Sequence, residues 1–253
     1  MSPPSSRPEF RYLTGLFLGA TIIAFAPILA VLSARWGELP ATTTAFWRVA
    51  LAFPVLGSLV ALRRATYRDV SAEQPPSESR WVLVAPGLLF SLDLTAWHAS
   101  MAYVSAGLAT LIGNLSVIVV PTVAWFWLKE RYPRSFFVGA AVALGGTVLL
   151  VIPPDRAVQS TLPEGGQNYL LGNLLALSTA FLYGGYQLTI KRARQRNSAL
   201  TVLFCTVTVA TVLLGAVCWV RGARVLPTDA RAWWALLALA VVCQCLGQGQ
   251  VGS

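Results

Sequence analysis

The stretch WVLVAPGLLFSLDLTAWHASMAYVSAGLATLIGNLSVIVVPTVAWFWL, residues 81–128, runs for 48 residues and is interrupted only by Asp93 and His98. As a single helix it would be ~72 Å long, about twice the thickness of a bilayer. We therefore predict a helical hairpin that crosses a membrane twice. Its natural corner is the segment YVSAGLA at 103–109.

The rest of the chain has the same apolar character. Apolar residues make up 56% of the sequence and charged residues 11%, whereas soluble domains carry about 25% charged residues. Further runs, each close to the ~20 residues that span a bilayer, lie at 12–34, 39–62, 135–154, 165–190, 197–220 and 232–253. The sequence thus predicts an all-α integral membrane protein, a polytopic helical bundle with eight spans.

The positive charges predict the orientation of these spans. Thirteen Lys and Arg residues fall at the N-terminus and in alternate loops, five fall in the other loops, and Arg48 lies within a span. Positive residues concentrate in cytoplasmic loops, so we expect a multi-pass protein of the cell membrane with a cytoplasmic N-terminal tail at 1–11. The net charge of +9 reflects this topology, and no basic face of the kind that binds nucleic acid is present.

The residue types that carry catalysis are scarce. The chain has one histidine, and its four cysteines all lie in the last two predicted spans. These residues form no zinc-binding spacing, no glycine loop for phosphate and no catalytic triad. We therefore expect no enzyme activity, no catalytic residues, no metal and no cofactor.

Two weak internal similarities suggest a repeat. YLTGLFLGATIIAF from Tyr12 resembles YLLGNLLALSTAFL from Tyr169, and SRWVLV ending at Val84 resembles RAWWALL from Arg231. Five predicted spans precede the second copy, and an odd number makes that copy cross the membrane in the opposite direction. Inverted repeats of this kind are typical of secondary transporters, which bind their substrate near the midplane between the two halves.

Several separate stretches resemble one transporter family. The segments DLTAWHASMAYVSAGLATLIGNLSVIVVPTVAWFWLKER, GAAVALGGTVLL, LALSTAFLYGGYQLTIKR and VVCQCLGQG are similar to the drug/metabolite transporter superfamily, in its EamA-like branch. The resemblance extends from about Tyr12 to Gly249. It implies two inverted five-helix repeats that move small metabolites, and it is nearly silent on the substrate.

The resemblance also sets an expectation for the domains. Residues 12–154 correspond to a complete first repeat of five spans, and residues 165–253 correspond to three spans of an incomplete second repeat. We therefore expect a chain truncated within its second repeat. The alternative to a transporter is a non-transporting membrane interaction protein, the remnant of such a transporter.

Two charged residues lie within predicted spans. Arg48 is nine residues past Leu39 and Asp93 is ten residues before Tyr103, so both lie ~13–15 Å from the same interface. They are equally consistent with a structural ion pair between two spans and with a site where one of them faces the substrate. Trp97 shares the helix face of Asp93, whereas His98 points about 140° away from it.

Other polar residues repeat at helical spacing. Thr110 and Asn114 are four apart, as are Thr179, Tyr183 and Gln187, while Gln244 and Gln248 share a face. Such residues either hydrogen-bond between helices or line a wet wall, and for Thr110 and Asn114 the first reading is slightly favoured. The residues predicted to line the substrate site are Arg48, Asp93, Trp97, Asn114, Tyr183, Gln187 and Gln244.

Together these observations predict a secondary transporter, a permease or exporter, that moves a small polar metabolite or drug-like solute by alternating access. Its partners would be the solute and the lipid bilayer, with a coupling proton and a homodimer as open alternatives.

Overall fold

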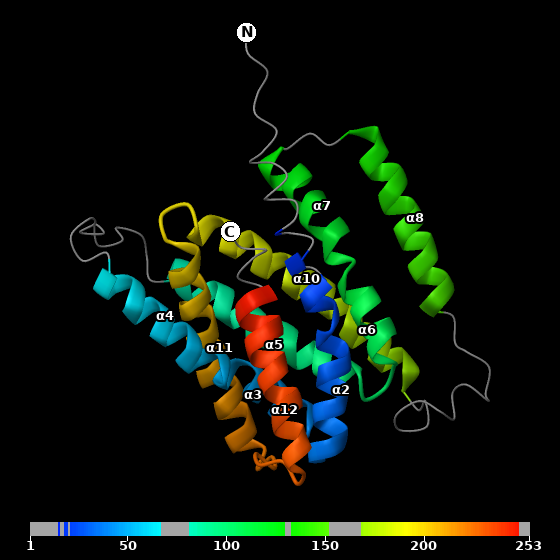
Figure 1. Ribbon diagram of the computed structural model, residues 1–253. Coiled ribbons are helices and arrows are strands. Elements are labelled where there is room, and N and C mark those ends of the chain that lie inside the picture. Colours follow the sequence, from blue (N-terminus) through cyan, green and yellow to red (C-terminus); the bar gives the residue numbers. More distant parts are fainter. Residues whose placement is uncertain are drawn as a thin grey trace.

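The computed structural model describes residues 15, 18, 19, 21–66, 81–129, 133–151 and 168–247. These residues form helices joined by short turns, with no strand among them. The predicted N-terminal tail at 1–11, the loops at 67–80 and 152–167, and Gln248 lie outside the described residues. The fold confirms the expected all-α bundle (Figure 1).

The predicted hairpin is present, with its corner slightly earlier than expected. Helix α5 (Trp81–Ser100) ends in a turn at 101–105, and α6 (Ala106–Gly113) begins where the Ser105 hydroxyl accepts a hydrogen bond from the backbone N–H of Leu108. Serine is a strong N-cap because its side chain satisfies a free N–H of the first turn. Capping at Ser105 therefore places the corner at 101–105.

Three predicted spans are divided into two helical pieces each. The first is α3 (Ala41–Ala50) with α4 (Ala52–Thr66), the second is α6 with α7 (Ser116–Leu128), and the third is α12 (Ala230–Ala238) with the π-helix η2 (Leu239–Gly247). The break at Leu51 has a simple cause. Pro54 lacks the N–H that would bond the carbonyl of Ala50, and its ring crowds that carbonyl.

In the first span, helical residues 21–24 and a turn at Phe25 precede α2 (Ala26–Gly37). The remaining spans are the single helices α8 (Arg134–Val151), α10 (Tyr169–Ala193) and α11 (Ala199–Val220). Among the described residues, four helical stretches are long and apolar enough to cross a membrane, at 41–63 (α3 with α4), 81–100, 106–123 (α6 with the start of α7) and 199–220. Shorter apolar helices cover 21–37, 134–149 and 230–245.

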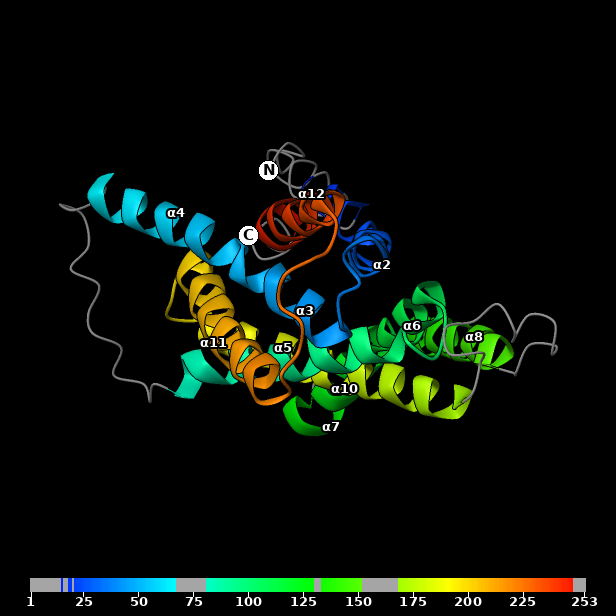
Figure 2. The same cartoon turned by 90° about the horizontal axis from the view of Figure 1, so that it is seen from below.

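Helix α5 lies at the centre of the bundle. It packs most extensively against α10 and also against α11 and α3, and Figure 2 shows it running beneath α3 beside α10. Phe90 and Leu94 of α5 join Val49, Tyr186 and Val207 in the main apolar core. Helix α8 stands at the edge of the bundle in Figure 1 and presents mostly exposed apolar side chains.

A second, smaller contact joins the two ends of the chain. Helix α2 packs along α12, and Ala26 and Ala30 meet Trp97, Leu239 and Cys243 in a separate apolar cluster. The walls around the space beside α5 come from α2, α3, α6 and α10, and η2 packs against α3. This arrangement positions the candidate site.

Candidate solute-binding cavity

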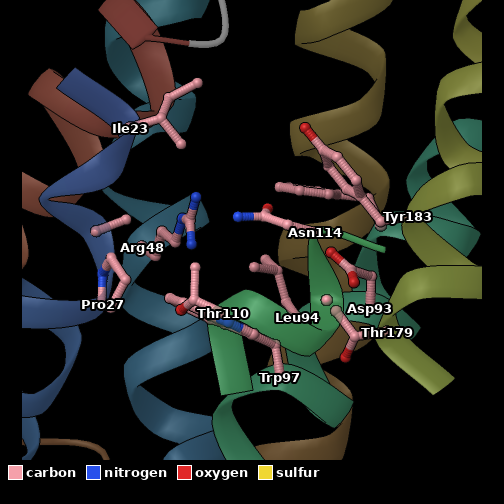
Figure 3. A pocket seen from close by; sticks show the side chains of 13 residues that line it. Ile23, Pro27, Arg48, Asp93, Leu94, Trp97, Thr110, Asn114, Thr179 and Tyr183 are labelled. Atoms are coloured by element: carbon pink, nitrogen blue, oxygen red, sulfur yellow. The ribbon is translucent and has the colours of Figure 1, made fainter. Parts of the chain in front are cut away.

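A cavity of about 110 Å³ lies between α2, α3, α5, α6 and α10. Figure 3 shows it from close by, with Arg48 on one wall and Asp93, Thr179 and Tyr183 on the opposite wall. Its lining is mixed, and consists of Ile23, Ala26, Pro27, Arg48, Phe90, Asp93, Leu94, Trp97, Thr110, Gly113, Asn114, Thr179 and Tyr183. A concave, largely apolar pocket with a few convergent polar groups is the usual form of a small-molecule site.

Arg48 projects from the last turn of α3 and is only 5% exposed. Its Nε donates a hydrogen bond to Oε1 of Gln244 at 3.1 Å. Its guanidinium carbon also lies 5.7 Å from the centroid of the Trp97 ring, within the range of a cation–π interaction. These two contacts hold the guanidinium in place at the cavity wall.

Asp93 faces the cavity from the middle of α5 and is also 5% exposed. Its Oδ1 has no hydrogen-bond partner among the described residues. No ion pair within 4.0 Å joins it to Arg48, so the direct pair considered from the sequence is not formed in the described part of the chain. Equal depth fixes the height of two residues along the membrane normal, and it does not decide whether their side chains meet.

Trp97 and Asn114 also line the cavity, together with Thr110. Trp97 lies one turn after Asp93, as the four-residue spacing predicts, and Figure 3 shows it below the space between the two charged groups. Asn114 lies in the turn between α6 and α7 and is exposed, while the Thr110 hydroxyl donates to the carbonyl of Ala106 at 2.7 Å. Asn114 thus offers a free side-chain amide to the cavity, whereas the Thr110 proton is used within its helix.

Helix α10 contributes Thr179 and Tyr183, which are four residues apart. Gln187 continues the same spacing but is exposed and is not part of the lining. Tyr186 is buried on another face, where its ring stacks on Phe90 with the centroids 4.9 Å apart. Of the three α10 residues predicted at four-residue spacing, Thr179 and Tyr183 therefore line the cavity and Gln187 does not.

Gln244 lies behind the cavity wall. It is fully buried in η2 and touches the site through Arg48. The direction of its side chain depends on the π-helical geometry of η2, whereas the prediction from the sequence assumed the α-helical angle between successive residues. Single-turn π segments in α-helices are frequent at functional sites.

His98 is not among the residues that line the cavity. It is buried, its Nδ1 lies 2.8 Å from the carbonyl oxygen of Leu94, and its ring meets Trp97 edge to face. The described residues contain no group of three or more His, Cys, Asp or Glu that could hold a metal ion.

Three lining residues of the first span were not predicted from the sequence. Ile23 precedes α2, Ala26 and Pro27 belong to its first turn, and the proline was the sequence signal available for them. Gly113 lets α6 approach α10, since a Cβ at that position would lie 3.1 Å from Cγ2 of Thr179. Apolar and glycine positions of this kind become visible only when the helices are packed.

The helix arrangement resembles that of a solved protein, and the sequence resembles those of membrane transporters. A solved crystal structure superposes with a TM-score of 0.62 at 20% identity, covering 94% of this chain and 79% of the other, a likeness that concerns the fold. The uncharacterized inner membrane transporter YhbE of Escherichia coli K12 is 26% identical over 208 residues, which cover 79% of this chain and 59% of YhbE. Purine permease 2 of Arabidopsis thaliana is 28% identical over 118 residues, or 45% of this chain and 32% of the permease.

The chain thus spans about 59% of the length of the YhbE relative that it matches. The sequence pattern of the EamA-like transporter family matches residues 11–152 and again residues 170–250. Both matches fall on the apolar helices described above, and the inner membrane relatives are transporters by name. The chain is therefore a membrane protein and belongs to the EamA-like transporter family.

Proposed function

We propose that the chain binds a small solute carrying both a positive and a negative group, and moves it across the cell membrane by alternating access. The observation that carries this proposal is the pair of opposite charges on facing walls of one cavity, Arg48 and Asp93, without a direct ion pair between them. The residues proposed to line the solute are Arg48, Asp93, Trp97, Asn114 and Tyr183. Gln244 supports Arg48 from behind, and Gln187 lies beyond the lining.

Electrostatics favours a dipolar solute. Charges inside a membrane are costly unless they are paired or hydrated, so buried opposite charges normally approach each other. Here the hydrogen bond to Gln244 and the Trp97 ring hold Arg48, while Asp93 lines the cavity and its buried Oδ1 has no hydrogen-bond partner among the described residues. A carboxylate on the solute would pair with Arg48 and an ammonium group with Asp93, so that one molecule neutralises both walls.

The volume limits the size of the solute. A space of about 110 Å³ holds roughly four water molecules, because each takes about 30 Å³ in the liquid. A molecule the size of a small amino acid is therefore the natural upper limit in this state. The apolar lining from Phe90, Leu94 and Pro27 suits the carbon skeleton of such a molecule.

The helix packing supports the two-repeat reading of 12–154 and 165–253. The first span of the second repeat, α10, packs on the third span of the first, α5. In the same way, α2, in the first span of the first repeat, packs on α12, in the third span of the second. This reciprocal exchange is the pattern of two halves related by a twofold axis, and the cavity lies between them, as in transporters with inverted repeats.

Orientation, coupling and assembly complete the proposal. The charge distribution favours a cytoplasmic N-terminus. Asp93 is the natural carrier of a coupling proton, because it is the acidic group that lines the cavity. For the assembly, a monomer and a homodimer are the two alternatives.

The test compares three solutes with one skeleton. Alanine carries both charges, lactate carries only the negative one, and alaninamide carries only the positive one. Purified protein should be stabilised against heat by alanine at concentrations at least tenfold lower than by either relative, a difference of ~1.4 kcal/mol in binding. In vesicles, only alanine should drive counterflow.

Two variants make the assignment specific. Arg48→Gln should weaken binding of alanine and lactate while sparing alaninamide, and Asp93→Asn should do the reverse for the two singly charged solutes. Equal binding of all three solutes, or identical changes in both variants, would overturn the proposed pairing of solute charges with the two walls.

A further inference from the structure

A second pocket, of about 280 Å³, lies further towards the C-terminal end of α10 than the central cavity. It is bounded by α4, the C-terminal half of α10, the N-terminal end of α11, and η2. Its lining shares no residue with the central cavity, and consists of Leu56, Leu59, Arg63, Tyr186, Ile190, Arg194, Ala199, Leu200, Val202, Leu203 and Cys245. Figure 2 shows α4 extending outward past α11 in this region.

The lining has two chemically distinct parts. Two arginines, Arg63 from α4 and Arg194 from the turn after α10, belong to the pocket, and the other lining residues are apolar apart from Tyr186 and Cys245. Among the described residues, no acidic side chain lines the pocket and neither guanidinium has an ion-pair partner. The described lining therefore combines two positive charges with an apolar interior.

The position of the pocket matches the edge of a bilayer. Arg63 and Arg194 lie with the basic clusters at 63–68 and 191–196, on the side predicted to be cytoplasmic. Leu56 is seven residues before Arg63 on the same helix, so the pocket extends ~10 Å from the charged end towards the membrane centre. Leu59 lines the pocket and is also 45% exposed, which opens one wall to the surrounding lipid.

An aromatic layer separates this pocket from the solute cavity. Tyr186 lines the pocket, and its ring stacks on Phe90 and lies 5.6 Å from the ring centroid of Tyr183, both of which line the cavity. The two spaces also differ in chemistry. The described lining of the central cavity holds opposite charges, whereas that of the second pocket holds positive charge and an apolar interior.

We propose that this pocket binds an anionic phospholipid of the cytoplasmic leaflet. Its phosphate lies between Arg63 and Arg194, and one acyl chain follows Leu56, Leu59 and Leu203 into the pocket. Basic pockets between transmembrane helices on the cytoplasmic side are suited to anionic headgroups. This site is independent of the solute class proposed above, and a failure of either proposal leaves the other intact.

The first experiment measures lipid selectivity directly. Detergent-purified protein is titrated with dioleoyl phosphatidylglycerol or dioleoyl phosphatidylcholine, and bound lipid is counted by native mass spectrometry. The wild type should bind phosphatidylglycerol at least tenfold more tightly. The double variant R63Q/R194Q should lose about 30-fold, because each arginine near an anionic headgroup contributes about fivefold.

The matched control is R221Q/R231Q, which removes two exposed arginines at the other end of the bundle. It should bind phosphatidylglycerol as the wild type does. Equal losses in the two double variants would show that general surface charge attracts the lipid, and would overturn the site. Unchanged selectivity in R63Q/R194Q would overturn it as well.

The second experiment asks whether a chain enters the pocket. Cys245 lines it and is partly exposed, so its reaction with N-ethylmaleimide, followed by peptide mass mapping, reports on occupancy. Phosphatidylglycerol nanodiscs should slow the reaction at least fivefold relative to phosphatidylcholine nanodiscs, with no change at Cys205, which is outside the lining. Leu203→Trp, which fills the pocket, should abolish the lipid-dependent difference.

Soluble glycerol phosphate separates a lipid from a free phosphate ligand. It carries the same charged group without the chains, and it should leave the reaction rate of Cys245 unchanged at millimolar concentration. Protection by glycerol phosphate alone would identify a site for soluble phosphate compounds. Equal protection by both lipids would show a nonselective lipid contact, and either result would overturn the proposal.

Discussion

Replacing Gln244 with leucine tests how the cavity keeps its two charges apart. Gln244 is fully buried, and its Oε1 accepts the 3.1 Å hydrogen bond from Nε of Arg48. Leucine has a similar volume, so the change removes the acceptor without opening a large cavity. A buried donor left without a partner costs ~1–3 kcal/mol, and more when it is charged. Arg48 also lines the cavity, where water can hydrate its guanidinium in place of Gln244. We therefore expect the loss of unfolding free energy to stay at ~1–3 kcal/mol.

The same change should alter solute binding. Without Gln244, the Arg48 side chain is free to turn from Trp97 towards Asp93 across the cavity. A solute would then compete with an internal ion pair, and a pair worth only ~1.4 kcal/mol lowers the affinity about tenfold. Gln244→Leu should therefore weaken binding of alanine while leaving the helical content unchanged.

Stability is measured by reversible unfolding in mixed micelles with increasing dodecyl sulfate, followed by far-ultraviolet circular dichroism. Thr206→Val is the matched control, because Thr206 is equally buried and its hydroxyl has no hydrogen-bond partner among the described residues. Removing an unpaired hydroxyl should be neutral or stabilising. If Gln244→Leu is as stable as Thr206→Val and binds alanine normally, Gln244 does not position Arg48.

Three further predictions address packing, the face of α5 and topology. Gly87→Ala places a Cβ 2.5 Å from a side-chain carbon of α11 and should cost ~1–3 kcal/mol of unfolding free energy. In the same unfolding assay, Gly146→Ala should be neutral or slightly stabilising, because a Cβ there meets nothing within 4 Å. Equal effects of the two variants would contradict the α5–α11 packing. His98→Gln should leave alanine affinity within about twofold by thermal shift, because the side chain lies outside the cavity, and a large loss would place the wrong face of α5 towards the solute. In intact cells, an impermeant maleimide should label a cysteine at Leu226 and fail to label one at Gln195, both exposed positions, and the opposite pattern would reverse the proposed orientation.

The sequence by itself determined the fold class and the set of charged residues available to a site. Long runs without charge lie inside the membrane, where no water can bond the backbone, so they form helices. A helix of 48 residues would be about twice as long as the bilayer is thick, so that run must fold back. The same reasoning placed Arg48 and Asp93 inside spans and at one depth. It also put Trp97 on the face of Asp93, because the α-helical period fixes relative angles along a regular helix.

The tertiary structure decided which of these side chains meet. Depth says nothing about rotation around a second helix axis. Only the packed bundle shows that Arg48 contacts Gln244 and Trp97, and that Oδ1 of Asp93 has no hydrogen-bond partner in the described part of the chain. The π-helical η2 changes the angle per residue, so the face of Gln244 did not follow from α-helical spacing. The α2 wall and the arginine-lined pocket combine residues from helices far apart in the chain. Their proximity depends on how close the helices can pack, and no single segment of sequence carries that information.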